Sequence, residues 1–150
     1  MKMSDENCNP FGKCEEQRGK IKVIVCAEKS KKYEYINGSK HFIVKIRVDG
    51  CLIKTETERK CDFMILNCNE PKKAYLIELK GHDLNHAASQ ILNVINLFQR
   101  ELLAYEIHAR IVLSRAFQGD IQSENYVKLQ RKIKNIDRIK HRSIEFSEKF

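Results

Sequence analysis

The chain has 150 residues, of which 28 are Lys or Arg and 20 are Asp or Glu, so its formal net charge is +8. This length fits one ordinary domain, and a hydrophobic fraction of 42% excludes wholesale disorder, because that much apolar surface can offset the entropy lost on ordering the chain. There is no run of about 18 apolar residues and no apolar stretch typical of a secretion signal, so we expect a cytoplasmic protein without a membrane span.

The first 20 residues are polar, and we expect a loose lead-in there, with a short helix around residues 14–18. Residues 21–150 are then expected to form a single domain. The cysteines show no CxxC spacing, and a chain with an adequate core does not need disulfides. We therefore predict that all of them are thiols: Cys8, Cys14, Cys26, Cys51, Cys61 and Cys68.

Strands are the first regular elements expected after the lead-in. Asn37-Gly38 separates two β-prone runs, which predicts a hairpin, because both residues tolerate the positive φ of a tight turn. Residues 42–48 alternate apolar and polar side chains, as a strand with one wetter face does. Residues 61–67 and 74–80 are further strand-like runs, and a turn at residues 69–71 joins them.

A helix is expected next, with Asp83 as its N-cap, because apolar residues recur at steps of three and four over residues 84–102. Residues 105–113 alternate as a strand, a loop is expected at 117–120, and a final basic helix at 126–142. A strand, a long helix and a strand in succession imply a crossover connection. We therefore predict an α/β (α+β) fold in which a central mixed β-sheet is flanked by helices.

Much of the positive charge lies in residues 126–142, which hold seven Lys or Arg against one Asp. Such a block attracts polyanions, and nucleic acid is the commonest polyanion in the cytosol. The alternative is that these residues form a solvated helix face. We expect nucleic-acid contact from four of them: Lys128, Arg131, Lys132 and Lys134.

The candidate chemistry lies on the strands at 61–67 and 74–80. Glu78 and Lys80 are two residues apart on one strand, so their side chains leave the same face, and Asp62 lies near Glu78 if the two strands pair. Two carboxylates can bind Mg²⁺ (Mn²⁺ can substitute), and the cation can generate a water nucleophile for phosphodiester hydrolysis. The lysine can orient that water or neutralise charge in the transition state. The simpler alternative is an exposed Glu78–Lys80 salt bridge, which contributes little.

The stretch CDFMILNCNEPKKAYLIELKGHDLNHAASQILN resembles the core of the PD-(D/E)xK nuclease superfamily, most closely its small stand-alone members. The pattern is an acid at the start of one strand, E-x-K in the next strand, and then a helix. The resemblance covers roughly residues 40–115 and implies a restriction-endonuclease-like fold. It also implies that Asp62 and Glu78 are metal ligands and that Lys80 assists the attacking water.

Further positions carry or limit this resemblance. Gln90 matches a glutamine that several branches place beside the active site, although Val94 stands where the Q-x-x-x-Y branch has Tyr. Cys61 replaces the proline of the motif's name. Asp49 either supports a turn or adds an acidic site residue. The superfamily often adds an acid from an N-terminal helix, and four residues are candidates for it: Glu15, Glu16, Glu28 and Glu34.

These features together predict a Mg²⁺-dependent nuclease that acts on DNA rather than RNA. The alternative is a catalytically inactive domain of the same fold that binds nucleic acid or serves as an adaptor. A third hypothesis is a component of a defence system or mobile element that acts only with a partner chain. The expected partners are nucleic acid and either a second copy of the chain, as a homodimer, or a partner protein.

Overall fold

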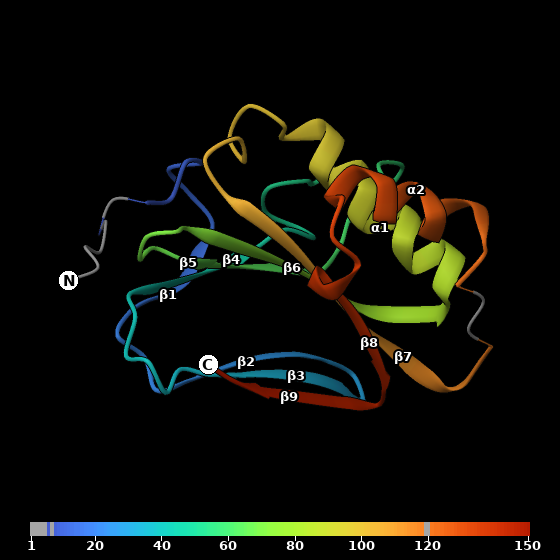
Figure 1. The fold of residues 1–150 in the computed structure, drawn as a ribbon, viewed down its shortest axis with the longest axis horizontal. Coiled ribbons are helices and arrows are strands. Elements are labelled where there is room, and N and C mark those ends of the chain that lie inside the picture. The colour runs from blue at the N-terminus through green and yellow to red at the C-terminus, as the bar shows by residue number, and fades with distance from the viewer. Residues whose placement is uncertain (1–5, 7, 119–120) are drawn as a thin grey trace.

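The computed structural model describes residues 6, 8–118 and 121–150, apart from the side chains of residues 80–82 and 115–118 (Figure 1). Its strands form a main sheet and a small sheet. The main sheet contains, in spatial order, β1 (Glu15–Gly19), β4 (Ile43–Arg47), β5 (Phe63–Asn67), β6 (Lys73–Asp83), β7 (Glu106–Gln118) and β8 (Ile139–Ser143). The small sheet contains β2 (Val23–Glu28), β3 (Lys31–Ile36) and β9 (Glu145–Lys149).

The helices α1 (Leu84–Leu97) and α2 (Glu124–Ile133) cover one face of the main sheet, and the small sheet covers the other (Figure 1). Strands β1, β4, β5 and β6 pair antiparallel, whereas β6, β7 and β8 pair parallel. α1 connects β6 to β7, and α2 lies between β7 and β8 in the chain. The predicted mixed sheet, the pairing of the two acid-bearing strands and the crossover connection are therefore confirmed.

Residues 63–66 of β5 form an unbroken apolar run because both faces of this strand are covered. Met64 and Leu66 pack in the core under the helices, whereas Phe63 and Ile65 pack in a second core between the two sheets. All four side chains are buried, as in other strands that are covered on both faces. Each such side chain contributes about 1.5–3 kcal/mol when fully buried, so the centre of the main sheet is well anchored.

The chain crosses between the sheets at the place where a hairpin was predicted. β3 pairs with β2 and β9, and β4 pairs with β1 and β5, so the expected pairing across Asn37-Gly38 is wrong. The Asn37 amide donates to the carbonyls of Ile21 and His41 at 2.9 and 2.8 Å, and its oxygen accepts from the His41 amide. These bonds redirect the chain into the main sheet instead of closing a two-strand turn.

The C-terminal strands correct the prediction of a basic helix over residues 126–142. α2 ends at Ile133, because Lys134 adopts a left-handed conformation with φ of 69°. A short 3-10 helix, η1 (Ile136–Arg138), then leads into β8. The chain passes from β8 to β9 at Ile144, whose amide donates to Leu113 of β7 and whose carbonyl accepts from Lys32 of β3.

Buried charges join β9 to the main sheet. The Glu148 carboxylate accepts from Arg110 at 2.5 Å, from the Tyr33 hydroxyl at 2.7 Å and from Lys140 at 3.1 Å. Burial alone would raise the pKa of Glu148, but hydrogen bonds from Arg110 and Tyr33 outweigh it and lower that pKa. The ionised carboxylate thus compensates the buried Arg110 guanidinium.

Two expectations for the N-terminal region are wrong. Residues 15–19 form the edge strand β1, paired with β4, rather than a short helix. Disulfides join Cys8 to Cys68 and Cys14 to Cys51, so the prediction of thiols holds only for Cys26 and Cys61. These bonds attach the N-terminal segment to the main-sheet loops, a contact between distant residues that sequence spacing could not reveal.

The remaining elements agree with the predictions apart from their bounds. Asp83 caps α1 by accepting from the His86 amide at 2.7 Å. α1 ends at Leu97 rather than near residue 102, and β7 continues beyond residue 113. The loop predicted at 117–120 lies partly outside the described residues. No described helix is long and apolar enough to span a membrane.

Candidate active site

The pairing of β5 with β6 brings Asp62 and Glu78 together. Phe63 is paired with Ile77, and the Asp62 amide donates to the same Ile77 carbonyl at 2.9 Å, so Asp62 meets β6 one residue out of the regular register, next to Glu78. Alternation from Leu76 places Glu78 on the face toward the helices.

Both carboxyl groups lie below the protein surface. Asp62 is 3% exposed and Glu78 is 1% exposed. An Asp62 oxygen, Oδ2, accepts from the Leu79 amide at 2.7 Å, so this side chain continues the β5–β6 pairing where the backbone ladder stops. Buried carboxylates have a large desolvation cost unless hydrogen bonds or cations compensate it.

The thiol of Cys61 lies close to both acids. Burial raises the pKa of Cys61 well above its usual value, and the negative charges of Glu78 and Asp62 raise it further. Cys61 is fully buried and stays protonated at neutral pH, so it acts as an apolar neighbour rather than as a nucleophile.

The donor set of the pair suits a hard divalent cation. Carboxylate oxygens are the ligands that Mg²⁺ prefers, and Mg²⁺ commonly uses one or two protein carboxylates while keeping several waters. Asp62 and Glu78 are the residues that would hold it. Among the described residues there is no group of three or more His, Cys, Asp or Glu side chains arranged to hold a metal ion.

Lys80 follows Glu78 by two residues in β6, as predicted, but its side chain lies outside the described part of the chain. The pairing of β6 with β7 becomes irregular between Glu78 and Gly81. The strand therefore departs from a regular ladder directly after the predicted metal ligand, a feature common next to active sites.

Gln90 contacts the segment before Asp62. Its side-chain amide donates to the Lys60 carbonyl at 2.9 Å. One turn further along α1, the Asn93 amide donates to the Arg59 carbonyl at 2.7 Å and to the Glu58 carboxylate at 2.6 Å. Gln90 and Asn93 together hold residues 58–60, which we call the Asp62 approach segment.

A cavity of about 610 Å³ opens beside the approach segment. Asp49 lines it, and the Asp49 backbone amide donates to the Asp62 carbonyl at 3.3 Å. The other lining residues come from the following loop and from the first half of α1: Gly50, Lys54, Glu56, Thr57, Glu58, Arg59, Lys60, His86 and Gln90. This cavity, which we call the 49–60 cavity, borders the predicted site.

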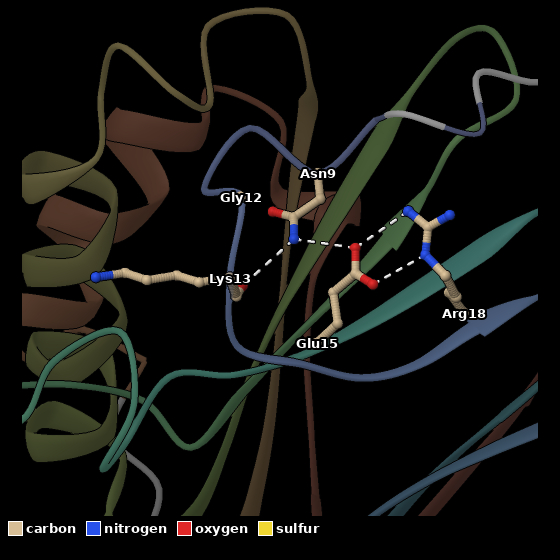
Figure 2. A pocket seen from close by; sticks show the side chains of 5 residues that line it. All are labelled: Asn9, Gly12, Lys13, Glu15 and Arg18. Carbon is tan, nitrogen blue, oxygen red and sulfur yellow. Dashed lines mark hydrogen bonds and ion pairs between the residues drawn. The ribbon is translucent and has the colours of Figure 1, made fainter.

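The candidate N-terminal acids lie on other parts of the molecule. Glu15 is on β1, which β4 separates from β5, and Figure 2 shows its carboxylate facing Arg18 and Asn9. The hydrogen bond from Arg18 lowers the pKa of Glu15. Glu16 pairs with Lys45 and Arg47. The remaining candidates, Glu28 and Glu34, belong to the small sheet.

The residues predicted to contact nucleic acid lie on or directly after α2. Lys128 forms an exposed ion pair with Glu124 at 3.0 Å, and the other three residues, Arg131, Lys132 and Lys134, are exposed. Lys132 and Lys134 line a different cavity, near Leu102 and the C-terminal half of α1. The structure therefore does not place them in the lining of the 49–60 cavity.

Sequence reasoning missed Asn93 and the contact between Asp49 and Asp62. Asn93 could have been noticed, because it lies three residues after Gln90 and shares its helix face. The Asp49 contact depends on how the chain bends after β4, for which the sequence carries no comparable signal. Comparison with known proteins adds no assignment: no family model, curated protein or solved structure matches this chain.

Proposed function

We propose that this protein is a metal-dependent nuclease of the PD-(D/E)xK type, acting on DNA rather than RNA. The observation that carries the proposal is the pairing of β5 with β6, which brings two buried acids, Asp62 and Glu78, next to each other. Both acids come from adjacent strands, and the helix α1 follows the second strand, as the resemblance implies. The order of these elements also supports a restriction-endonuclease-like fold.

In the proposed reaction, water attacks the phosphorus of a phosphodiester, one P–O bond breaks, and the leaving oxygen takes up a proton. Asp62 and Glu78 would hold Mg²⁺, which would polarise the phosphate and lower the pKa of a bound water. The hydrogen bond from the Leu79 amide fixes the Asp62 carboxylate. Lys80 neutralises charge that develops on the phosphate oxygens.

We assign the contacts with the nucleic-acid backbone to four residues: Lys128, Arg131, Lys132 and Lys134. The formal net charge of +8 favours binding of a polyanion. We also propose that the protein is cytoplasmic and that it acts as a homodimer or with a partner protein. The disulfides of Cys8 and Cys14 count against the cytoplasm, because disulfides persist mainly in oxidising compartments.

The test is incubation with plasmid and linear DNA in the presence of Mg²⁺ or EDTA. We expect cleavage only with the cation, and a rate at least about 100-fold lower for Glu78→Gln, because one metal ligand is lost. Glu145→Gln is the matched control, since Glu145 is exposed on β9. Cleavage that persists in EDTA or in Glu78→Gln contradicts the proposal.

The second candidate is an inactive domain of the same fold that binds nucleic acid. The observation that favours it is the exposed basic surface of α2, which carries Lys128, Arg131 and Lys132. In that case, calorimetry with Mn²⁺ shows no binding, and salt-sensitive DNA binding is unchanged in Asp62→Asn.

A further inference from the structure

We propose that a cavity lined by Lys20, Lys22 and Lys40 binds the diphosphate group of a small molecule. We call this recess the lysine cavity, and its volume of about 410 Å³ falls in the range of small-ligand sites. The inference goes beyond the proposed nuclease function and does not rest on it. The lysine cavity has three further lining residues: Ile36, Asn37 and Gly38.

The charge of the lysine cavity has one sign. No Asp or Glu is among its described lining residues, and none of its three lysines forms an ion pair with a described acid. Lysines elsewhere in the chain do have such partners, for example Lys45 with Glu16 at 3.1 Å. Like charges that line one recess repel one another, so an anion bound among them is favoured.

A buried side chain fixes the two chain segments that carry these lysines. Asn37 is 3% exposed, and its side-chain amide donates to the carbonyls of Ile21 and His41. Its backbone amide donates to the Lys22 carbonyl at 2.8 Å, and its own carbonyl accepts from the Lys40 amide at 3.2 Å. The backbone of the lysine cavity is therefore organised before any ligand binds, which lowers the entropy cost of binding.

The turn that carries Lys40 has little freedom to rearrange. A Cβ atom on Gly38 would lie 2.7 Å from the main-chain oxygen of Phe150, so only glycine fits at this close approach. Lys40 has a φ of 55°, in the left-handed region that side chains rarely adopt. Residues held in such conformations cluster at functional sites, including ligand-binding sites.

The lining indicates the class of anion. A lysine ammonium is a compact charge that binds phosphate, and its aliphatic stem can cover apolar surface such as Ile36. A phosphate monoester carries about 1.5 to 2 negative charges at neutral pH, so a diphosphate carries roughly three, which matches the three lysines. The lysine cavity is thus suited to a diphosphate with a small organic group.

The lysine cavity is separate from the acid pair. His41, which follows Lys40, has its Nδ1 atom 2.8 Å from the side-chain nitrogen of Asn67. Asn67 is the last residue of β5, whereas Asp62 directly precedes the first. An anion in the lysine cavity therefore binds independently of a cation held by Asp62 and Glu78.

The test is calorimetry with inorganic pyrophosphate and with ADP, in EDTA and at low salt, so that no metal-bound phosphate contributes. We expect one-to-one binding that weakens as the salt concentration rises. Lys40→Gln should lower the affinity at least about 5-fold, because one charged contact is lost. Lys29→Gln is the matched control and should change the affinity less than about 2-fold. Lys29 is also exposed, has a φ of 54°, and lies at the end of the β2–β3 hairpin remote from Ile36.

The two probes distinguish the sources of the diphosphate. Tighter binding of ADP identifies an organic diphosphate, and tighter binding of pyrophosphate identifies the inorganic ion. Lys22→Gln should weaken both, as Lys40→Gln does. Absence of binding by both probes, or an equal loss of affinity in Lys29→Gln and Lys40→Gln, overturns the inference. Displacement of pyrophosphate by an equal concentration of an oligonucleotide without terminal phosphates also overturns it, in favour of a nucleic-acid backbone.

Discussion

At the scale of single residues, Asp62 combines a structural contact with a proposed chemical role. Its Oδ2 atom accepts from the buried Leu79 amide, and its position next to Glu78 makes it a candidate metal ligand. An asparagine keeps an oxygen acceptor of the same shape but loses the negative charge. An alanine loses both, so the two substitutions separate the two roles.

We predict that Asp62→Ala is destabilised by about 1–3 kcal/mol, because the Leu79 amide loses its acceptor. This corresponds to roughly 2–4 °C in Tm per kcal/mol for a chain of this size. Asp62→Asn should keep its Tm within about 2 °C of the unmodified protein. Calorimetry should show that both variants lose Mn²⁺ binding. Unchanged Mn²⁺ affinity in Asp62→Asn would contradict the assignment of this carboxylate as a ligand.

The pairing of the two strands that carry the acids could be predicted from the sequence, because it depends on local information. An aspartate next to one apolar strand and a glutamate within the next strand become neighbours through a short turn. The sequence could not predict that the Gln90 amide donates to the Lys60 carbonyl. The two groups meet only because the loop from residue 49 folds back onto α1.

At the scale of elements, α1 positions the chain that leads into β5. Gln90 and Asn93 donate three hydrogen bonds to the Asp62 approach segment. We therefore regard these two amides as positioning residues, which act on Asp62 through the backbone.

We predict that Gln90→Ala combined with Asn93→Ala speeds amide hydrogen exchange over residues 56–62, because that segment loses its contacts with α1. Mn²⁺ affinity should fall about 3- to 10-fold, since second-shell contacts orient metal ligands. The matched control is Asn96→Ala, at an exposed position of the same helix. If Asn96→Ala changes exchange over residues 56–62 equally, the positioning role is wrong.

The elements that sequence analysis missed are those fixed by distant partners. Residues 139–149 are rich in charge; residues 139–142 were assigned to the end of a basic helix, and residues 143–149 to no element. They form β8 and β9 because β7 and β3 offer open edges to them. Likewise, the run before Asn37 turns away from β4 because β2 and β9 pair with it instead.

At the scale of the whole molecule, His108 links stability to pH. Burial lowers the pKa of His108 to about 4, against the hydrogen bond that its Nε2 donates to Glu106, which acts in the opposite direction. The unfolded chain, with a histidine pKa near 6.5, binds more protons than the folded chain between pH 6.5 and 4. The contribution of His108 to the free energy of unfolding is therefore fully present above pH 6.5 and is lost as the pH falls toward 4.

We predict that the free energy of unfolding decreases by about 2 kcal/mol between pH 7 and pH 5 because of His108. Urea unfolding at a series of pH values measures this decrease. His108→Phe keeps an aromatic ring for stacking on Tyr75 but cannot be protonated, so its curve should be flatter by that amount. His141, whose pKa burial also lowers, adds to the slope in the same direction. Identical slopes in both proteins would contradict this account.

The passage of the chain through Ile144 has a consequence for biosynthesis. This residue is hydrogen-bonded to β7 on one side and to β3 on the other, and the strands that flank it complete both sheets. A nascent chain emerges from the ribosome N-terminus first, so β3, already paired with β2, keeps its other edge open until residues 145–149 have left the exit tunnel. Assembly of the two layers is therefore a late event, and a chaperone that shields the open edge of β3 would act before that moment.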